Sequence, residues 1–219
     1  MDNKVIPINE AVAKIENGMT VMMGGFMGCG NAHHMVQAMI DAGTTDLTLI
    51  ANDGSIPGYG LAKLIENHRL RKLVASHVGL NPMVAQLMNS GELEVELVPQ
   101  GTLVERIRSG GAGLGGVLTP TGVGTPVADG KQVIVIDGRQ FLLEKPLRAD
   151  VALINGYRVD PLGNIWYRGD SRNFNPVMAM GADVVIVEAD HLVEVGGIRP
   201  EDIVTPSVLV DYIVEGGDL

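Results

Sequence analysis

The stretch that most constrains the fold of this chain is GMTVMMGGFMGCGNAHH, from Gly18 to His34. Residues 20–23 form a short apolar run bounded by glycine, which is typical of a strand buried on both faces of a parallel sheet. Four glycines end this run, and Asn31 is then a candidate cap for a helix with apolar residues at helical spacing. The stretch therefore predicts a strand, a glycine turn and a helix.

Strand and helix patterns alternate along most of the chain that follows. Further strands are expected at 47–51, 72–76, 94–98, 151–154 and 184–188, and helices at 8–17, 60–67, 81–90 and 102–109. Residues 173–176 are expected to precede one more helix, which runs to Gly181. Because such alternation places helices on both faces of a parallel sheet, we predict an α/β fold with an open, mostly parallel sheet covered by helices. The 219 residues, 46% of them hydrophobic, provide enough core for a single domain over 1–219.

Residues 110–130 interrupt this alternation. Their sequence, GGAGLGGVLTPTGVGTPVADG, is too rich in glycine and proline for a regular element and too apolar for a flexible linker. Asp137-Gly138 then separates strand-like segments at 132–136 and 139–143, which predicts a two-residue hairpin. We therefore expect a glycine-rich loop and a hairpin insertion.

Charge and cysteine content narrow the function classes. The formal net charge of −10 disfavours sequence-independent binding of nucleic acid. Cys29 is the single cysteine, which excludes an internal disulfide and suits a reducing compartment. No apolar run reaches about 18 residues and the first residues do not resemble a signal sequence, so we expect a cytoplasmic protein without a membrane partner. His33 and His34 point to different sides of a helix, and no metal site is expected.

Candidate ligand-facing residues gather in the glycine turn. At a helix start such a turn lets phosphate groups approach backbone amides, although a tight turn between a strand and a helix needs the same glycines. The order G-x-x-G-x-G is not the dinucleotide fingerprint. Within the turn, Cys29 is either a reactive thiol or a small buried hydrophobe. The turn comprises Gly24, Gly25, Phe26, Met27, Gly28, Cys29 and Gly30.

Other polar residues follow the second and third strands. Asn52, Asp53, His77 and Asn81 are each either ligand-facing or a cap of a turn or helix. Glu105 and Glu144 are the carboxylates most easily mistaken for a nucleophile, and we interpret both as paired or solvated charges.

A series of longer segments carries a family resemblance. The chain resembles the alpha subunits of the class I coenzyme A transferases of acetate, acetoacetate and butyrate type, and the corresponding half of 3-oxoacid CoA-transferase. The family usually has a small residue and a proline after the last glycine of the turn, where this chain has Asn31-Ala32. The matching segments are GMTVMMGGFMGCG (18–30), LTLIAND (47–53), ASHVGLNP (75–82), VPQGTLVERIRSGGAGLGG (98–116), LTPTGVGT (118–125), RNFNP (172–176) and PEDIVTP (200–206).

The resemblance implies transfer of CoA from an acyl-CoA to a short-chain carboxylate through a glutamyl-CoA thioester. In this family the glutamate lies on the beta subunit, in a serine-glutamate-asparagine-glycine motif that this chain lacks. A beta subunit is therefore the implied partner, in a heterotetramer or a larger assembly, with CoA as a substrate and no tightly bound cofactor. Residues 24–30 match the CoA-binding signature of the family. Gln100 matches a glutamine near the acyl group, where its amide could donate to a developing oxyanion.

Two other function classes are compatible with the residues. The first alternative is a dinucleotide- or sugar-phosphate-binding enzyme, because such enzymes also begin with a βαβ unit and have an acidic residue, here Asp53, at the end of the second strand. A non-catalytic ligand-binding or scaffold subunit is the second alternative. The transferase interpretation accounts for all the matching segments together.

Overall fold

The computed structural model describes residues 3–217. Its strands are β1 (Thr20–Met23), β2 (Leu47–Ala51), β3 (Leu70–Ala75), β4 (Glu94–Leu97), β5 (Val117–Thr119), β6 (Val133–Ile136), β7 (Arg139–Glu144), β8 (Ala149–Val159), β9 (Ile165–Trp166), β10 (Ala182–Leu192) and β11 (Tyr212–Glu215). Its α-helices are α1 (Ile8–Val12), α2 (His33–Asp41), α3 (Ala62–Glu66), α4 (Pro82–Ser90), α5 (Gln100–Gly111) and α6 (Asn175–Met178). Short 3-10 helices are η1 (Pro126–Ala128), η2 (Gly169–Arg172), η3 (Pro200–Asp202) and η4 (Ser207–Leu209).

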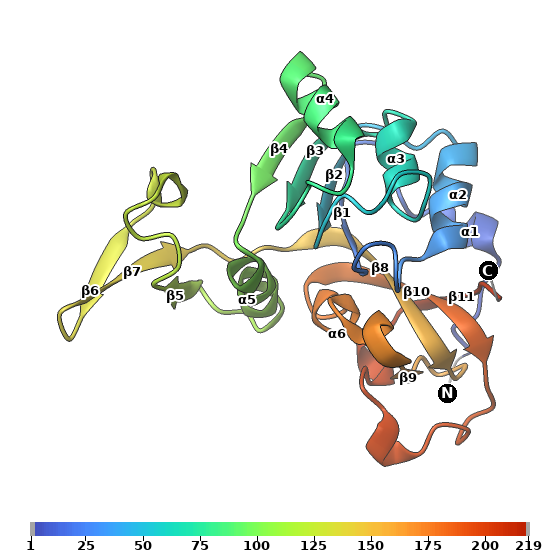
Figure 1. Cartoon of the computed structure of the whole chain (residues 1–219). Helices are drawn as coiled ribbons and strands as arrows, with labels where there is room; N and C mark the ends of the chain where they lie inside the picture. The colour runs from blue at the N-terminus through green and yellow to red at the C-terminus, as the bar shows by residue number, and fades with distance from the viewer. Residues whose placement is uncertain (1–2, 218–219) are drawn as a thin grey trace.

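The main sheet has the strand order β11-β10-β8-β1-β2-β3-β4 (Figure 1). All neighbours in this order are parallel, and β9 adds to β8 in the antiparallel direction. The prediction of an open, mostly parallel α/β sheet is therefore confirmed. In the part of the chain that the structure describes, no helix is both long and apolar enough to cross a membrane.

Side chains of the central strands alternate between two cores. In β1, Val21 and Met23 pack with α1, α2, α3 and α4 on one face, while Met22 packs with α5 and α6 on the other. All three side chains are fully buried. A strand that is buried on both faces has a continuous run of apolar residues. This is why the central strands could be predicted from the sequence.

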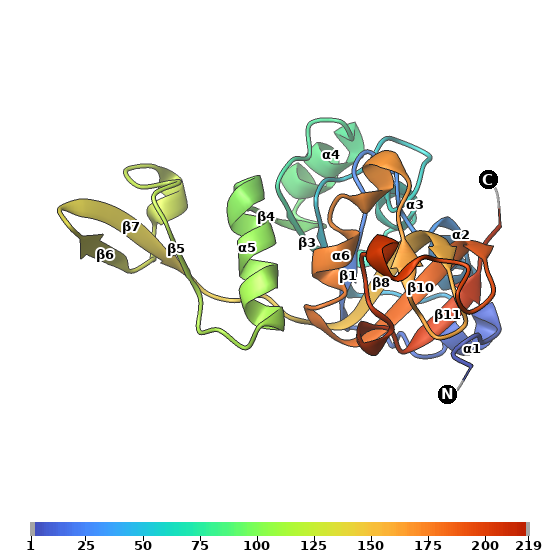
Figure 2. The same ribbon diagram turned by 90° about the horizontal axis from the view of Figure 1, so that it is seen from below.

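A second, antiparallel sheet has the order β5-β7-β6, and we call it the arm sheet. It stands apart from the main sheet, beyond α5, in both views (Figures 1 and 2). Asp137 and Gly138 adopt φ values of 49° and 76°, as a type I′ turn requires, and Ile136 pairs with Arg139 across it. The predicted hairpin is confirmed, and β5 and η1 add order to the glycine-rich segment before it.

Charged side chains attach the arm sheet to α5. Glu144 is 1% exposed, and one of its carboxylate oxygens accepts a hydrogen bond from Lys131 Nζ at 2.6 Å. Arg106 Nε on α5 lies 3.9 Å from the other oxygen, and Arg106 Nη1 donates to Glu96 at 3.2 Å. Glu144 is thus a paired structural charge, as the sequence indicated.

Two expectations about element bounds need correction, and one strand of the main sheet was not expected. The first helix ends at Val12 rather than at residue 17. Strands β8 and β10 each continue for eleven residues, well beyond the apolar cores at 151–154 and 184–188. These two strands pair with each other up to Val159 and Leu192, so the backbone ladder keeps their polar ends extended. Strand β11, which no expectation included, joins the sheet beside β10.

Candidate functional site

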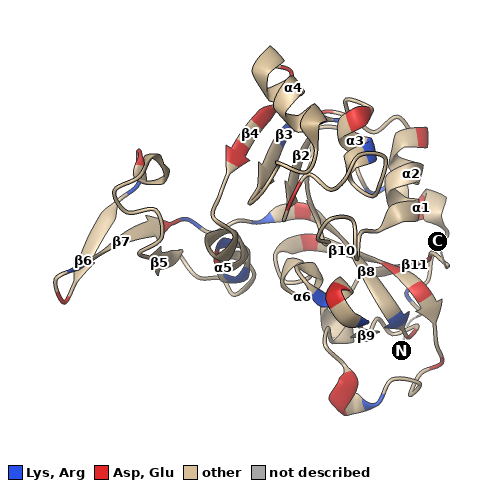
Figure 3. Cartoon of the chain, viewed as in Figure 1, with Lys and Arg blue, Asp and Glu red and all other residues tan. Residues whose placement is uncertain are grey.

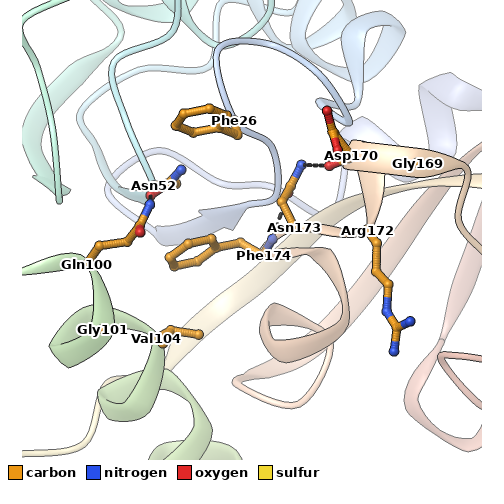
Figure 4. A pocket seen from close by; sticks show the side chains of 10 residues that line it. All are labelled: Phe26, Asn52, Gln100, Gly101, Val104, Gly169, Asp170, Arg172, Asn173 and Phe174. Carbon is orange, nitrogen blue, oxygen red and sulfur yellow. Dashed lines mark hydrogen bonds between the residues drawn. The ribbon is translucent and has the colours of Figure 1, made fainter.

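A cavity of about 730 Å³ opens where the carboxyl ends of β1 and β2 approach the amino end of α5 (Figure 4). Ligands of open α/β sheets bind outside the carboxyl ends of the strands. We therefore take this Gln100 cavity as the candidate site. Its walls are formed by Phe26, Asn52, Gln100, Gly101, Val104, Gly169, Asp170, Arg172, Asn173 and Phe174.

Gln100 is held in place by a buried partner. Its Nε2 donates to Asn52 Oδ1 at 2.9 Å, and the same oxygen accepts a hydrogen bond from Ser76 Oγ at 2.9 Å. Asn52 is 2% exposed, so its position is fixed by the sheet below it. A side-chain amide has two N–H groups, which leaves Gln100 one donor for a ligand. The side chains of Asn52 and Gln100 meet at one side of the cavity (Figure 4).

The amino end of α5 adds positive potential at the same place. Gln100, Gly101 and Val104 all come from the first two turns of this twelve-residue helix. The first backbone N–H groups of a helix have no partner within the helix, and the helix dipole favours negative charge there. An oxygen that becomes negative in the cavity would therefore meet both the Gln100 amide and the helix end.

Apolar side chains form the middle of the cavity wall. Phe26, from the glycine turn, is 41% exposed and Phe174, just before α6, is 7% exposed. The two aromatic rings and Val104 lie beside the polar pair Asn52–Gln100, and the far side is lined by Asp170, Arg172 and Asn173 (Figure 4). Such walls exclude water from a reacting group and strengthen the electrostatic interactions inside.

The tip of the glycine turn is a tight type I′ turn. Phe26 and Cys29 exchange backbone hydrogen bonds of 3.0 and 2.9 Å across Met27 and Gly28, whose φ values are 53° and 89°. Such φ values are rare for a residue with a long side chain, which makes Met27 a strained position. The turn presents Phe26 toward the Gln100 cavity and places Met27 and Cys29 at a second cavity.

Most backbone amides of the glycine turn already have partners within the chain. Gly25 N donates to Asn173 Oδ1 at 3.0 Å, and Met27 N donates to Asp53 Oδ2 at 2.8 Å. The amides of Phe26 and Cys29 bond each other's carbonyl groups. The sequence-based reason for ligand contact, amides presented to phosphate groups, therefore does not hold for these four. A contact of residues 24–30 with CoA stays a prediction, and it would involve the exposed side chains at the tip.

Packing explains the first glycines of the turn. A Cβ atom on Gly24 would lie 1.7 Å from Asn175 Oδ1. That oxygen accepts from Asn155 N at 3.1 Å, while Asn175 Nδ2 donates to the carbonyl groups of Gly30 and Ser171. Asn175 thus ties the turn to β8 and to the segment before α6.

The start of α2 differs from the expectation. Asn31 does not cap the helix, because its Nδ2 donates to Gly24 O at 2.6 Å and its Oδ1 accepts from Leu61 N at 3.0 Å. The helix is capped instead by Glu188 on β10. This carboxylate accepts from Met35 N at 2.8 Å, from His34 N at 3.2 Å and from His34 Nδ1 at 3.0 Å. Since Glu188 lies more than 150 residues further along, sequence spacing gave no sign of it.

The second cavity has a volume of about 340 Å³ and lies on the other side of the glycine turn. Burial lowers the pKa of His33, whose ring stacks on Tyr59 with centroids 4.4 Å apart. Burial, with the nearby Asp170 and Asp190, raises the pKa of the Cys29 thiol. The thiol is therefore protonated at neutral pH and is a poor nucleophile there.

Several other polar candidates have structural partners. Asn81 caps α4 by accepting from Met83 N at 3.1 Å. The two carboxylate oxygens of Asp53 accept hydrogen bonds from Met27 N and Ser55 N. Asp53 is therefore engaged in a turn, unlike the strand-end carboxylate that binds a ribose hydroxyl in dinucleotide-binding folds. This removes the main support for a dinucleotide-binding enzyme. Glu105 is exposed and binds Arg108, as expected of a solvated charge.

Sequence reasoning missed the contribution of residues 169–174 to the cavity. Asn173 holds the glycine turn by two hydrogen bonds: its Oδ1 accepts from Gly25 N, and its Nδ2 donates to Cys29 O at 3.0 Å. Phe174 forms part of the cavity wall. The segment RNFNP was noted only as part of the family resemblance. Conversely, the glycine-rich residues 110–116 and 119–125, which resemble family segments, do not line the cavity.

Comparisons with known proteins agree with this architecture. The family model described as Coenzyme A transferase matches residues 5–216. The chain is 52% identical to the acetate CoA-transferase subunit alpha of Escherichia coli strain K12, covering 98% of this chain and 97% of that protein. It is 49% identical to the acetoacetyl-CoA:acetate/butyrate CoA transferase alpha subunit of Clostridium acetobutylicum, with 98% and 99% covered.

Solved structures share the fold at lower identity. Glutaconate coenzyme A-transferase from Acidaminococcus fermentans superimposes with a TM-score of 0.86 at 20% identity, covering 98% of this chain and 76% of that one. The acyl-CoA transferase of E. coli O157:H7, solved as a thioester complex with CoA, gives a TM-score of 0.85 at 20% identity. The alignment covers 97% of this chain and 47% of that one, so our chain spans about half of that enzyme. On the family model and the two relatives together, the chain belongs to the coenzyme A transferase family.

Proposed function

We propose that this chain is the alpha subunit of a heteromeric CoA-transferase, which moves CoA from an acyl-CoA to a short-chain carboxylate. Relatives at 52% and 49% identity are named alpha subunits of transferases for acetate and for acetoacetyl-CoA with acetate or butyrate. CoA is a substrate in this proposal, and no tightly bound cofactor takes part. The single cysteine favours a reducing compartment, and we place the enzyme in the cytoplasm as one domain of 219 residues.

The observation that carries the proposal is the composition of the Gln100 cavity. It combines an anchored amide donor and a helix amino end with apolar walls, which suits a thioester carbonyl. Among its lining residues the only carboxylate is Asp170, which is exposed. The cavity therefore resembles half of an acyl-transfer site, with the nucleophile supplied by another chain.

The proposed reaction has two halves. A glutamate of the beta subunit attacks the acyl-CoA carbonyl, forming a mixed anhydride and releasing the CoA thiolate. The thiolate then attacks the glutamyl carbonyl of the anhydride, which gives a glutamyl-CoA thioester and frees the first carboxylate. The second carboxylate enters and reverses these two steps with its own oxygen, so CoA leaves on the new acid.

This chain contributes stabilisation and shielding to that reaction. The free N–H of Gln100 donates to the carbonyl oxygen as it becomes negative, supported by the amino end of α5. Phe26, Phe174 and Val104 keep water from the anhydride, which would otherwise hydrolyse. The exposed tip of the glycine turn contacts CoA through Phe26, Met27 and Cys29.

The test is to trap the intermediate in the complete enzyme. The chain is co-expressed with its proposed beta subunit, treated with acyl-CoA and reduced with borohydride, and the reduced residue is mapped by mass spectrometry. We expect the modified glutamate on the beta subunit and no label on this chain. The variant Asp170→Asn serves as the control, because it removes the carboxylate in the cavity and should keep the label. A reduced residue on this chain, or full transferase activity of this chain alone, contradicts the proposal.

A further inference from the structure

The arm sheet ends in a free edge formed by β6. Because β7 is the central strand of this sheet, β6 has a paired neighbour on one side within the described residues. Its four residues, Val133 to Ile136, are β-branched and uncharged (Figure 3). Val133, Val135 and Ile136 are 46%, 61% and 45% exposed. Natural edge strands usually carry a charge, a proline or a bulge that prevents pairing with another chain, and β6 has neither charge nor proline.

We propose that β6 pairs with β6 of a second copy of this chain, antiparallel and across a two-fold axis. The backbone restricts the possible registers. Leu143 N donates to Gln132 O at 2.9 Å, so position 132 faces β7, as do 134 and 136. The N–H and C=O groups of Val133 and Val135 therefore point outward. A new ladder can form when these outward-facing positions pair with each other. The flanking positions are less suited to pairing, because Lys131 N already donates to Ala128 O at 3.0 Å and Asp137 lies in the hairpin turn with a φ of 49°.

Charge selects one of the remaining registers. When the axis passes through Ile134, Val133 lies opposite Val135 of the other copy. Lys131 and Asp137 flank β6, so Lys131 of one copy then comes near Asp137 of the other copy at both ends of the ladder. An axis at Val135 would instead place Lys131 opposite Arg139. Like charges directly opposite each other destabilise a sheet, whereas opposite charges stabilise it. Lys131 Nζ already donates to Glu144 and retains further N–H donors for Asp137.

The third register is also unfavourable. An axis at Val133 would bring Asp129 opposite Asp137, again a like-charge pair. The register centred on Ile134 is thus the one with complementary charges, and its apolar residues match as well. Val133 and Val135 of both copies form a patch on one face, and the two Ile134 side chains meet on the other.

The position of the arm sheet makes this pairing possible. The sheet projects from the main sheet in both views, so β6 is accessible to another molecule (Figures 1 and 2). Pairing would merge two three-stranded sheets into one of six strands. A second copy fits this edge because a two-fold axis makes the strand its own complement in shape and in charge.

The first experiment measures the mass of the full chain by sedimentation, alone and in complex with the beta subunit. We expect this chain to dimerise on its own, without the beta subunit, and to keep the same contact in the complex. Val135→Lys should raise the dissociation constant between copies at least about tenfold, since each dimer carries the substitution twice. Val208→Lys, at a residue of η4 that is 84% exposed, is the matched control and should leave the mass unchanged.

The second experiment tests the register by cross-linking. Non-hydrogen-bonded partners in an antiparallel ladder have Cα atoms about 4.5 Å apart, which a disulfide can span. Ile134→Cys should therefore yield a disulfide-linked dimer under mild oxidation. In this register position 136 lies opposite position 132 of the other copy. The two thiols of Ile136→Cys are therefore four residues apart along the ladder, roughly 13 Å, and should not cross-link. Both variants keep Cys29, so any background from that thiol is the same.

Four results would overturn the proposal. One is a wild-type chain that is monomeric both alone and in the complex. Another is an association between copies that Val135→Lys does not weaken. The third is equal cross-linking of Ile134→Cys and Ile136→Cys. The fourth is protection of the β6 amides from hydrogen exchange only after the beta subunit is added, because the edge would then bind a different chain.

Discussion

The main sheet and the arm sheet use similar residues with opposite results. Val21, Met22 and Met23 of β1 are fully buried, because helices cover both faces of the main sheet. Val133 and Val135 of β6 are 46% and 61% exposed at the edge of the arm sheet, whereas Leu142 of the central strand β7 is fully buried. An apolar run therefore predicts a strand, but its surroundings decide whether that strand is a core or an open surface.

The two regions also differ in their polar groups. At the edge of the main sheet, side chains such as Asn52, Asp53 and Asn175 are buried and hydrogen-bonded, and they fix the geometry of the Gln100 cavity. The arm sheet has its buried charge, Glu144, only where it joins α5. We expect chemistry at the first region and association at the second.

The largest expected effect separates two glutamines, one in each region. Gln100→Ala should lower kcat of the reconstituted transferase about 100- to 1,000-fold, because an oxyanion donor is lost. Gln140→Ala, at an exposed position of β7, should leave kcat unchanged. Steady-state kinetics with a short-chain acyl-CoA measures both. A kcat for Gln100→Ala close to that of the wild type would place the chemistry elsewhere.

The second effect compares stability. Leu49→Ala, in a fully buried position of β2, should lower the free energy of unfolding by about 3 kcal/mol through lost burial and a cavity. Val135→Ala should lower it by less than about 0.5 kcal/mol in the monomer, because this residue is largely exposed. Urea unfolding followed by circular dichroism, at low protein concentration, gives both values. Equal costs would mean that the arm sheet has a core that we have not identified.

The third effect concerns acyl-chain selectivity and compares two phenylalanines, one in the Gln100 cavity and one in the arm sheet. Phe26→Ala should enlarge the Gln100 cavity and raise kcat/KM for a six-carbon acyl-CoA relative to acetyl-CoA about tenfold. Phe141→Ala, on β7, should leave this ratio unchanged and affect stability instead. Competition between the two acyl-CoA substrates measures the ratio directly. The role of Phe26 as a wall is wrong if both variants keep the wild-type ratio.

The smallest effect concerns pH. Because burial lowers the pKa of His33, the unfolded chain binds a proton there more readily than the folded chain. The free energy of unfolding is therefore higher when His33 is neutral in both states, above the ordinary histidine pKa of about 6.5, and it decreases as the pH falls through that value. His33→Phe keeps a ring against Tyr59 and should weaken this pH dependence in denaturant titrations. Residues 114–145 contain no histidine, so hydrogen exchange in the arm sheet should respond less than in α2.

The sequence predicted the fold better than the site. Apolar runs and helical spacing identified the strands and helices of the main sheet, and Asp137-Gly138 identified the hairpin, because these signals are local. Gln100 was correctly placed just past the end of a strand. Its contact with Asn52 at the end of the second strand emerged only from the structure. The role of Asn31 was wrong, because capping preference is a local tendency that the buried partners Gly24 and Leu61 overrode.

Local sequence by itself determined most of the element types, their order and the family to which the chain belongs, but not strands β5 and β11. Only the tertiary structure decided which amides remain free and which side chains enclose the cavity. Gly25 meets Asn173 across 148 residues and His34 meets Glu188 across 154, contacts set by the order of parallel strands in the sheet. Residues so far apart in the chain interact through the geometry of packing, which no spacing along the sequence encodes.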